Sequence, residues 1–195
     1  MIYLIRHGQT ALNSAHALQG RSDQPLNQTG EAQARAVGAW FQRQGIRFDQ
    51  IWSSPLQRAV KTARLIAGED ADIRTDGRLT EMDYGPYEGM DLTRPHPEVL
   101  AFFRDFVNTP APAGMEPLEA VVARLGDFLE MLRKDSEGAT VLLSTHAIAM
   151  KGALEYLTPE SRGSYWARNI GNCAVFQTEL ARGVFTVPTE LELQL

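Results

Sequence analysis

The chain is poor in cysteine, and this limits the ways in which it can be stabilised. Cys173 is the only cysteine among 195 residues, so no disulfide can form within the chain. A chain of this length buries about 70% of the surface that its unfolded form exposes. We therefore expect one stable domain over residues 1–195, without a disulfide or a structural metal, in a reducing compartment.

Long apolar runs and an excess of positive charge are also missing. No segment approaches the ~20 consecutive apolar residues of a membrane-spanning helix, and no basic residue precedes Arg6, unlike in a secretion signal. The net charge of −5 argues against a nucleic-acid-binding protein, which usually presents a basic face. These absences predict a cytoplasmic protein with neither a nucleic-acid nor a membrane partner. The negative net charge does not exclude a small anionic substrate, because the binding of a small anion depends on the residues around it.

The order of apolar and turn residues is typical of an α/β protein. Short apolar runs predict strands over residues 2–5, 48–53, 71–75, 140–145, 172–178 and 183–187. Helical periodicity between them predicts helices over residues 30–44, 54–67, 118–132 and 147–157. The second of these helices is expected to begin with Ser54 as its cap and Pro55 as its first residue. This alternation predicts a three-layer α/β/α sandwich with a mostly parallel central sheet.

Residues 76–116 interrupt that pattern. This segment contains five prolines and one short helical patch over residues 99–107 that is rich in phenylalanine. We interpret it as an inserted lid segment rather than as part of the sheet. Its large apolar residues could line a substrate pocket or form a small core of the lid itself, and the core is favoured for most of them: Tyr84, Tyr87, Phe102, Phe103, Phe106 and Met115.

Three of the predicted strands are followed by residues that suit an anion site. Arg6 and His7 follow the first strand, Arg58 lies in the first turn of the helix after the second strand, and His146 follows the strand over 140–145. In a parallel sheet these side chains and the adjacent helix N-termini meet at the carboxyl ends of the strands, where they can bind a phosphate. An arginine in a first helical turn opposes the helix dipole, which favours a functional role for Arg58.

These residue types suit the transfer of a phosphoryl group. Such a group carries its charge on the equatorial oxygens, so catalysis depends mainly on positioning and on charge stabilisation. Arg6 and Arg58 could each donate two hydrogen bonds to these oxygens, and a histidine with an unprotonated nitrogen can attack phosphorus. Glu81, at the start of the lid segment, is the candidate acid for the leaving oxygen, provided that it holds a proton near neutral pH.

The motif Arg6-His7-Gly8-Gln9-Thr10, with Asn13, resembles the R-H-G-x-T-x-x-N signature of the histidine phosphatase superfamily, the phosphoglycerate mutase-like proteins. Four later blocks resemble that family in the same order, and they lie at residues 20–34, 53–63, 81–89 and 145–146. By this resemblance His7 is the nucleophile, phosphorylated on its outer nitrogen, and Glu81 is the proton donor.

The resemblance also implies the other members of the site. Arg6, Arg58 and His146 complete the phosphate pocket, and His146 stabilises the transferring group. Substrate contacts are further implied for Gly8, Gln9, Thr10, Asn13, Gln19, Gly20 and Ala147. No metal and no other cofactor is implied.

Two positions depart from the family pattern, and a few residues match none of its blocks. Ala147 stands where the family usually has glycine, and residues 114–117 replace its usual glycine-glutamate-serine block. His16 and His96 are interpreted as surface residues. Arg21 is expected in a structural salt bridge, and Cys173 is expected to be buried and inert.

The leading hypothesis is a phosphomonoester hydrolase that acts on a small phosphorylated metabolite through a phosphohistidine. One alternative is a phosphoglycerate mutase-type transfer, but residues 82–90 contain no lysine, arginine or histidine, unlike the basic stretch of the glycolytic mutases. The other is a non-catalytic module that binds a phosphorylated ligand, which would tend to lose the nucleophile or the acid. The sequence leaves open which ester is used and whether the chain forms a homodimer.

Overall fold

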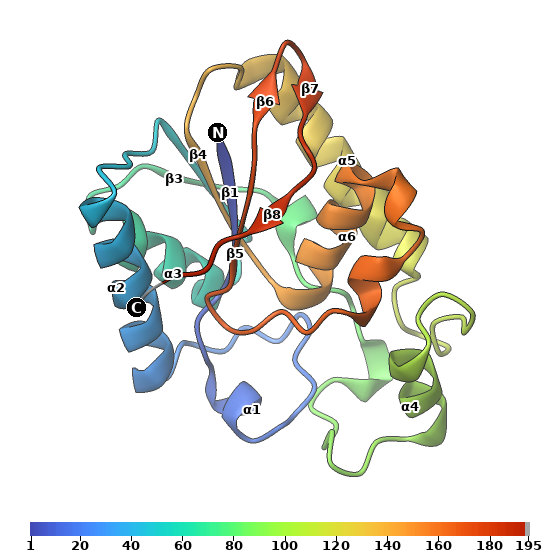
Figure 1. The fold of residues 1–195 in the computed structure, drawn as a ribbon. Helices are drawn as coiled ribbons and strands as arrows, with labels where there is room; N and C mark the ends of the chain where they lie inside the picture. Colours follow the sequence, from blue (N-terminus) through green and yellow to red (C-terminus); the bar gives the residue numbers. More distant parts are fainter. Residues whose placement is uncertain (194–195) are drawn as a thin grey trace.

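A six-stranded sheet forms the centre of the molecule (Figure 1). The computed structural model describes residues 1–193. The strand order is β3-β2-β4-β1-β5-β8, with β1 (Ile2–Arg6), β2 (Gln50–Ser53), β3 (Ile73–Thr75), β4 (Val141–Thr145), β5 (Val175–Thr178) and β8 (Thr189–Glu190). The first four strands are parallel to one another, whereas β5 is antiparallel to β1 and β8 to β5. The predicted mostly parallel sheet is therefore confirmed.

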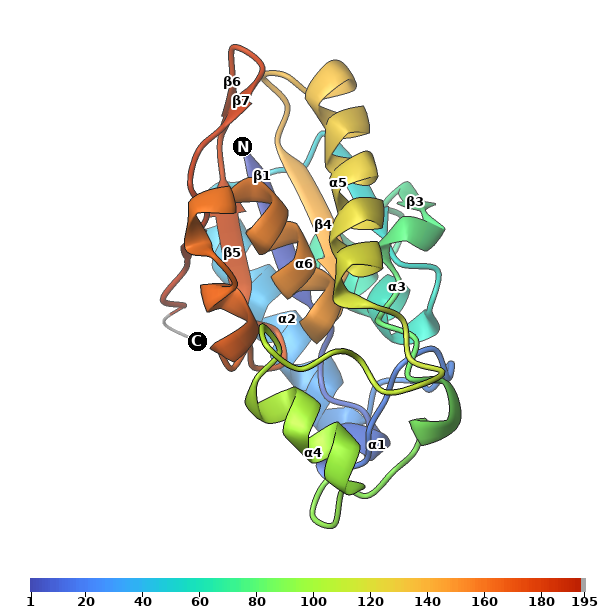
Figure 2. The same cartoon turned by 90° about the vertical axis from the view of Figure 1, so that its right-hand side faces the viewer.

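Two pairs of helices cover the two faces of this sheet, as Figures 1 and 2 show. One face packs against α2 (Gln28–Arg43) and α3 (Gln57–Ala67), and the other against α5 (Leu118–Asp135) and α6 (Ala147–Leu157). Successive residues of β1 point into opposite cores: Leu4 packs with the α5–α6 side and Ile5 with the α2–α3 side. Burial on both faces explains the continuous apolar run of this strand and confirms the three-layer sandwich.

The remaining elements are short. They are α1 (Ala11–Ser14) and α4 (Pro97–Arg104), the single turns η1 (Gly77–Leu79), η2 (Gly85–Tyr87), η3 (Pro159–Ser161) and η4 (Ser164–Ala167), and a separate hairpin of β6 (Leu180–Ala181) and β7 (Val184–Phe185). Within residues 1–193, no helix is long and apolar enough to cross a bilayer.

Two predicted boundaries were wrong. Helix α3 begins at Gln57 rather than at Pro55, because the amide of Ser54 still donates to the carbonyl oxygen of Ser144 in β4, at 2.9 Å. The chain therefore leaves the sheet later than the serine-proline pattern indicates. The predicted strand over 183–187 is not the partner of β5 in the main sheet, since Val184 and Phe185 pair with β6 and the edge position belongs to β8.

The lid segment, residues 76–116, lies beyond the carboxyl ends of the parallel strands, on the side of α5 and α6 (Figures 1 and 2). Its helix α4 begins at Pro97 and ends at Arg104, earlier than the predicted patch over 99–107. Val99, Phe102 and Met115 are buried in the same core as α5 and α6. The lid segment therefore shares the main core instead of forming one of its own.

Candidate active site

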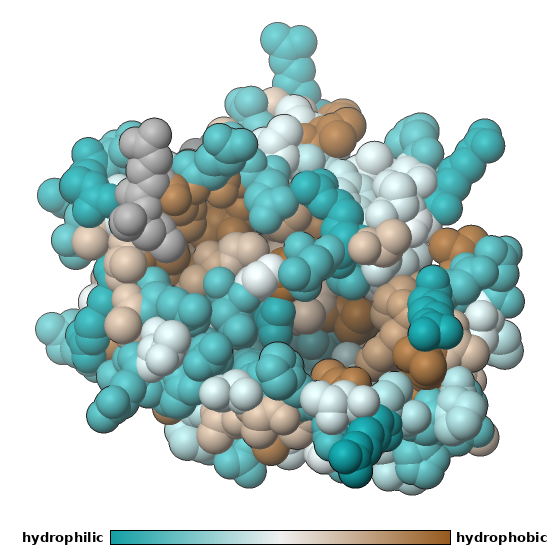
Figure 3. All heavy atoms as spheres, turned by 60° about the horizontal axis from the view of Figure 1, so that its bottom comes forward, coloured by the Kyte–Doolittle hydropathy of each residue, from teal (hydrophilic) through white to brown (hydrophobic). Residues whose placement is uncertain are grey.

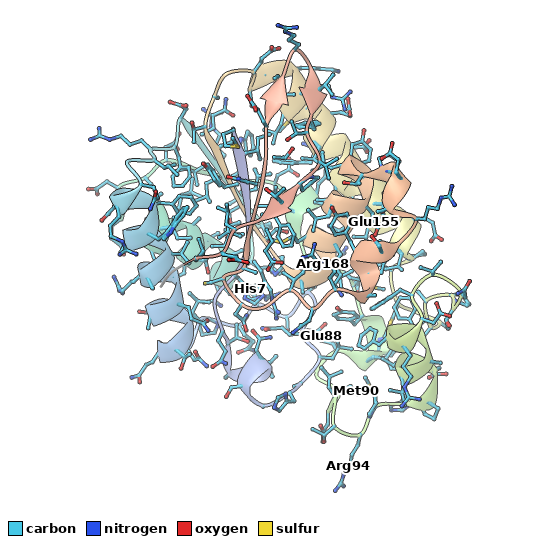
Figure 4. The ribbon with its side chains drawn as sticks, viewed as in Figure 1. His7, Glu88, Met90, Arg94, Glu155 and Arg168 are labelled. Atoms are coloured by element: carbon cyan, nitrogen blue, oxygen red, sulfur yellow. The ribbon has the colours of Figure 1, made fainter. Side chains whose placement is uncertain are left out.

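The strand order places the predicted phosphate-binding residues side by side. In the order β2-β4-β1, Arg6 is paired with Thr145 and Ser53 with Ser144, so the residues that follow these strands emerge at one edge. The imidazole rings of His7 and His146 lie edge to face there, with their centroids 5.0 Å apart. Figure 4 shows His7 at this lower end of the sheet, with Glu88 of the lid segment below it.

His7 is held in one tautomer by both of its neighbours. Its Nδ1 lies 2.7 Å from the carbonyl oxygen of Gly8, which can only accept a hydrogen bond, so Nδ1 carries the proton. Its Nε2 accepts a hydrogen bond from Nε of Arg58 at 3.2 Å. Burial, followed by the charges of Arg58 and Arg6, lowers the pKa of His7 well below its ordinary value. The imidazole is therefore neutral at pH 7 and directs a lone pair at Nε2 into the site.

Arg58 is completely buried and holds the loop after Gln19 against the site. Its guanidinium donates to the carbonyl oxygens of Ser22 at 2.7 Å and Gly20 at 2.6 Å, in addition to His7. Its position as the second residue of α3 confirms the predicted place in a first turn. A lysine could not reproduce these three bonds, because only a guanidinium presents several donors in one rigid plane.

Two buried nitrogen atoms at this edge have no hydrogen-bond partner within residues 1–193: Nε of Arg6 and Nδ1 of His146. Nη1 of Arg6 donates to the carbonyl oxygen of Ile170 at 2.5 Å. Nε2 of His146 lies 2.8 Å from the hydroxyl of Ser54. Burial, then the charges of His7 and Arg58, lowers the pKa of His146 well below its ordinary value. A bound anion is the natural partner for the free nitrogens.

Ser54 is a site residue that the sequence reasoning missed. Because a serine before proline is a familiar helix cap, its hydroxyl was assigned to α3. In the fold the residue directly follows β2, and its hydroxyl accepts a hydrogen bond from the amide of Leu56 at 3.3 Å and lies 2.8 Å from Nε2 of His146, which it orients. The signal that could have found it is its position, directly after a predicted buried strand.

Glu81 caps the helix that follows His146. Its buried carboxylate accepts hydrogen bonds from the amides of Ile148 at 3.2 Å, Ala149 at 3.0 Å and Met82 at 2.9 Å. The amide of Gln57, the first residue of α3, donates to the carboxylate of Asp23 at 2.7 Å. The expectation that free helix N-termini meet at the phosphate was therefore wrong for these amides, since carboxylates occupy them. The phosphate pocket consists mainly of side chains.

A cavity of 320 Å³ opens beside these residues and is lined by Arg6, Asn13, Gln19, Glu81 and Ala147, together with Ala17, Leu18, Tyr84, Leu92, Phe103, Phe106, Ile148, Lys151 and Asn169. Figure 3 shows this face of the molecule, which is hollowed near its centre where polar and apolar residues meet. The volume is at the lower end of the ~300–1,000 Å³ of typical ligand pockets. The space suits a small ligand.

The other residues of the first two motif blocks mainly shape the loop around this cavity. Thr10 caps α1, and its hydroxyl donates to Oε1 of Gln19 at 2.7 Å. Asn13 completes the capping box with Thr10. The amide of Gly20 donates a hydrogen bond to the carboxylate of Glu88 at 2.9 Å. Nε2 of Gln19 is buried without a partner within the described residues, so it stays available to a ligand.

Gly8 and Gln9 face away from the cavity. A Cβ atom on Gly8 would lie 2.4 Å from the carbonyl oxygen of Gly30, so glycine is required here by the close approach of α2. The side chain of Gln9 accepts a hydrogen bond from Asn27 at 2.9 Å. Direct substrate contacts by these two residues remain predictions.

The large residues of the lid segment divide between cavity and core. Tyr84, Phe102 and Met115 are buried in the main core, and Tyr84 also lines the cavity with Phe103 and Phe106, which are only partly buried. The hydroxyl of Tyr87 donates to Glu98 at 2.6 Å. A core position is therefore confirmed for Tyr84, Phe102 and Met115, in the main core rather than in one of the lid, whereas Phe103 and Phe106 line the cavity.

Two smaller predictions, for Arg21 and Cys173, also have outcomes. Arg21 forms salt bridges with Asp83 and Glu116, each at 3.4 Å, as expected. Cys173 is buried, and burial raises its pKa to about 12, as expected for an inert thiol. The part of the chain that the structure describes contains no cluster of three histidine, cysteine or acidic residues that could hold a metal ion.

Comparisons with known proteins place the chain in a family. A model of the histidine phosphatase superfamily (branch 1) matches residues 2–189. A 2,3-bisphosphoglycerate-dependent phosphoglycerate mutase from a Methylobacterium species is 33% identical over 83% of this chain and 83% of its own length. A probable phosphoglycerate mutase from Salmonella arizonae is 37% identical over 76% of this chain and 70% of its own.

Solved structures of similar fold include phosphatases. A phosphoserine phosphatase mutant from Entamoeba histolytica, in complex with phosphoserine, has a TM-score of 0.84 and 25% identity over 99% of this chain and 97% of its own. A mycobacterial glucosyl-3-phosphoglycerate phosphatase, in complex with VO3, has a TM-score of 0.80 and 28% identity over 91% of this chain and 92% of its own. The chain belongs to the histidine phosphatase superfamily, whose members include phosphatases and phosphoglycerate mutases.

Proposed function

We propose that the protein is a phosphomonoester hydrolase that works through a phosphohistidine on His7, without a metal ion, on a small phosphorylated metabolite. The observation that carries this proposal is the state of His7. A carbonyl oxygen accepts from Nδ1 and a guanidinium donates to Nε2, so a neutral imidazole offers one lone pair, as a nucleophile requires.

In the proposed first step, the substrate phosphate lies between Arg6, Arg58 and His146, and Nε2 of His7 attacks phosphorus in line. The phosphorus–nitrogen bond forms as the bond to the ester oxygen breaks, and Glu81 gives that oxygen its proton. The free Nε of Arg6 and Nδ1 of His146 could then stabilise the charge on the phosphoryl oxygens.

In the second step, water attacks the phosphohistidine while Glu81 takes up the proton of the water. Inorganic phosphate leaves, and His7 returns to its neutral state. The cycle therefore requires that the same carboxyl group acts first as an acid and then as a base. Glu81 lines the cavity beside Arg6, where it would face both the leaving alcohol and the incoming water.

A mutase is the second candidate, because the relatives by sequence are named phosphoglycerate mutases. It would keep the phosphohistidine and return the group to another hydroxyl, which requires a site for a second phosphate. The four lid residues that line the cavity, Tyr84, Leu92, Phe103 and Phe106, carry no charge at neutral pH. This apolar lining favours water as the acceptor over a second phosphorylated position.

A screen of metabolite phosphates tests the proposal and separates the two candidates. Purified protein, treated with a chelator, is incubated with each ester, and inorganic phosphate and phosphate-containing isomers are both measured. A hydrolase releases inorganic phosphate and alcohol in equal amounts. Accumulation of an isomer of the ester without release of inorganic phosphate would favour the mutase. The absence of a reaction with any ester would contradict both enzymes and favour a non-catalytic module that binds a phosphorylated ligand.

A further inference from the structure

Lys151 is a buried cation inside the candidate active site to which the proposed reaction assigns no role. It lies on α6, just over one turn after Ala147, and lines the same cavity as Arg6 and Glu81. Its side chain is almost fully buried. Its Nζ donates to the carbonyl oxygen of Trp166 at 2.8 Å and lies 5.2 Å from the centre of the Phe106 ring.

This cation forms no close ion pair among the described residues. None of the ion pairs formed within residues 1–193 includes Lys151. Burial lowers its pKa to about 8, with the charge of Glu81 opposing and that of Arg6 adding to this effect, so it is still mainly protonated at pH 7. An unpaired buried charge is unfavourable, and an anionic ligand in the cavity would relieve this cost.

A donor without a partner lines the same cavity. Nε2 of Gln19 is buried and has no hydrogen-bond partner among residues 1–193, although Oε1 of the same side chain accepts from Thr10 at 2.7 Å. The bond to Thr10 fixes the side-chain amide of Gln19, so Nε2 cannot rotate away and stays available to a ligand. The charged Nζ of Lys151 and the neutral Nε2 of Gln19 can therefore both donate to a ligand atom outside the phosphate pocket.

We propose that Lys151 and Gln19 bind a carboxylate of the substrate, so that the enzyme selects phosphate esters of small hydroxy acids over those of neutral alcohols. This inference rests on the proposed function. Among the residues that line the cavity, Lys151 is the one cation besides Arg6, and a single positive charge matches a carboxylate better than a doubly charged second phosphate. The cavity volume of 320 Å³ also fits a small acid.

A matched pair of substrates tests the inference. In 3-phosphoglycerate a carboxylate stands where glycerol 3-phosphate has a hydroxymethyl group, and the rest of the carbon chain is the same. The wild-type protein should prefer 3-phosphoglycerate, as measured by the ratio of kcat/KM for the two esters. Lys151→Met should lower this ratio by about 30-fold or more, the usual effect of removing one partner of a buried charge pair.

Two further variants separate charge from fold. Lys151→Arg keeps the positive charge on a bulkier, planar group, so it should lower the ratio less than Lys151→Met does. Lys134→Met, at an exposed position near the end of α5, should leave the ratio at the wild-type value. If Lys151→Met lowers kcat/KM equally for both esters, the lysine supports only the loop at Trp166, and the inference is overturned.

The failure of this inference can be told apart from failure of the proposed function. If the wild-type protein hydrolyses both esters without preference, the inference fails and the function stands. If it hydrolyses neither ester nor p-nitrophenyl phosphate, the function fails, and calorimetric titration of 3-phosphoglycerate then decides. Weaker binding to Lys151→Met than to wild type, with no such difference for glycerol 3-phosphate, supports the inference, and equal binding contradicts it.

Discussion

The two ends of the cavity are built in different ways. At the sheet edge, each key side chain is held by directional bonds to the backbone: His7 by one carbonyl oxygen, Arg58 by two, and Glu81 by three amides. At the lid segment, Phe103 is held by contacts between rings, with centroids 5.5 Å from Phe106 and 6.2 Å from Tyr84.

This difference separates reaction from selection. Hydrogen bonds fix distance and angle, so the sheet edge is arranged in advance for charge that develops during phosphoryl transfer. Contacts between apolar rings depend on area more than on direction, and the lid segment can change its residues without moving the nucleophile. We therefore expect the sheet edge, together with Glu81, to determine what reaction occurs, and the rest of the lid segment, together with Lys151, to determine on which ester.

The largest expected effect comes from the acid at the boundary of the two ends. Glu81→Gln should lower kcat/KM for an alkyl phosphate by about 10²–10⁴-fold, because the leaving alkoxide loses its proton donor. For p-nitrophenyl phosphate, whose phenolate leaves without a proton, the loss of kcat/KM should be far smaller. The comparison uses kcat/KM because this ratio reports the first step only, whereas kcat also contains the hydrolysis of the phosphohistidine, in which Glu81 acts as the base for every ester.

Glu88→Gln is the matched control for this variant, since Glu88 is a nearby carboxylate that binds the amides of Gly20 and Ser22. It should affect both esters alike. An equal loss of kcat/KM for both esters in Glu81→Gln would contradict the acid role.

The second effect concerns protons at the sheet edge. Burial lowers the pKa of both His7 and His146 well below 6.5. As the pH falls below 6.5, the unfolded chain binds protons that the folded site excludes, so the free energy of unfolding decreases. Each histidine contributes up to about 1.4 kcal/mol per pH unit. Denaturant unfolding between pH 6.5 and 5.5 measures the slope.

His146→Asn should remove about half of the slope that these two histidines cause. His96→Asn, at an exposed lid position, serves as the control and should leave the slope unchanged. The same slope in the wild type, His146→Asn and His96→Asn would mean that the fold does not protect His7 and His146 from protonation. That result would contradict the proposed difference between the sheet edge and the lid segment.

The smallest effect is expected at the lid segment. Phe103→Leu keeps an apolar lining but changes its shape, so the preference between two esters should shift by a few fold, as one methylene group in a pocket does at the lower end of its range. The ratio of kcat/KM for two esters of different size is the measurement. Val107→Ala, exposed on the same segment, should not change that ratio. A loss as large as that of Glu81→Gln would show that Phe103 takes part in the reaction.

The same division explains what the sequence predicts well. Arg6, His7 and His146 follow buried parallel strands, and the geometry of such a sheet alone brings these strand ends together. The site at the sheet edge was therefore predictable from strand order and residue type. Ser54 was not, because one serine-proline pattern is compatible with a helix cap and with an extended strand end.

The lid segment was less predictable for a physical reason. Phe102 and Phe103 are neighbours of the same type, yet one is buried in the core and the other lines the cavity. Only the position of α4 against α5 and α6 decides between them. The role of Lys151 was hidden in the same way, since its position in the sequence gives no sign that Trp166 and Phe106 enclose it.

Trapping the phosphorylated enzyme tests the central claim most directly. The protein is mixed with a reactive ester, quenched with alkali within milliseconds, and digested for mass spectrometry, with His7→Ala treated in parallel. We expect up to one phosphate per chain on His7, formed as fast as product appears, and neither phosphorylation nor turnover in His7→Ala. Turnover by His7→Ala at the wild-type rate, or phosphate found on His146 instead, would contradict the account.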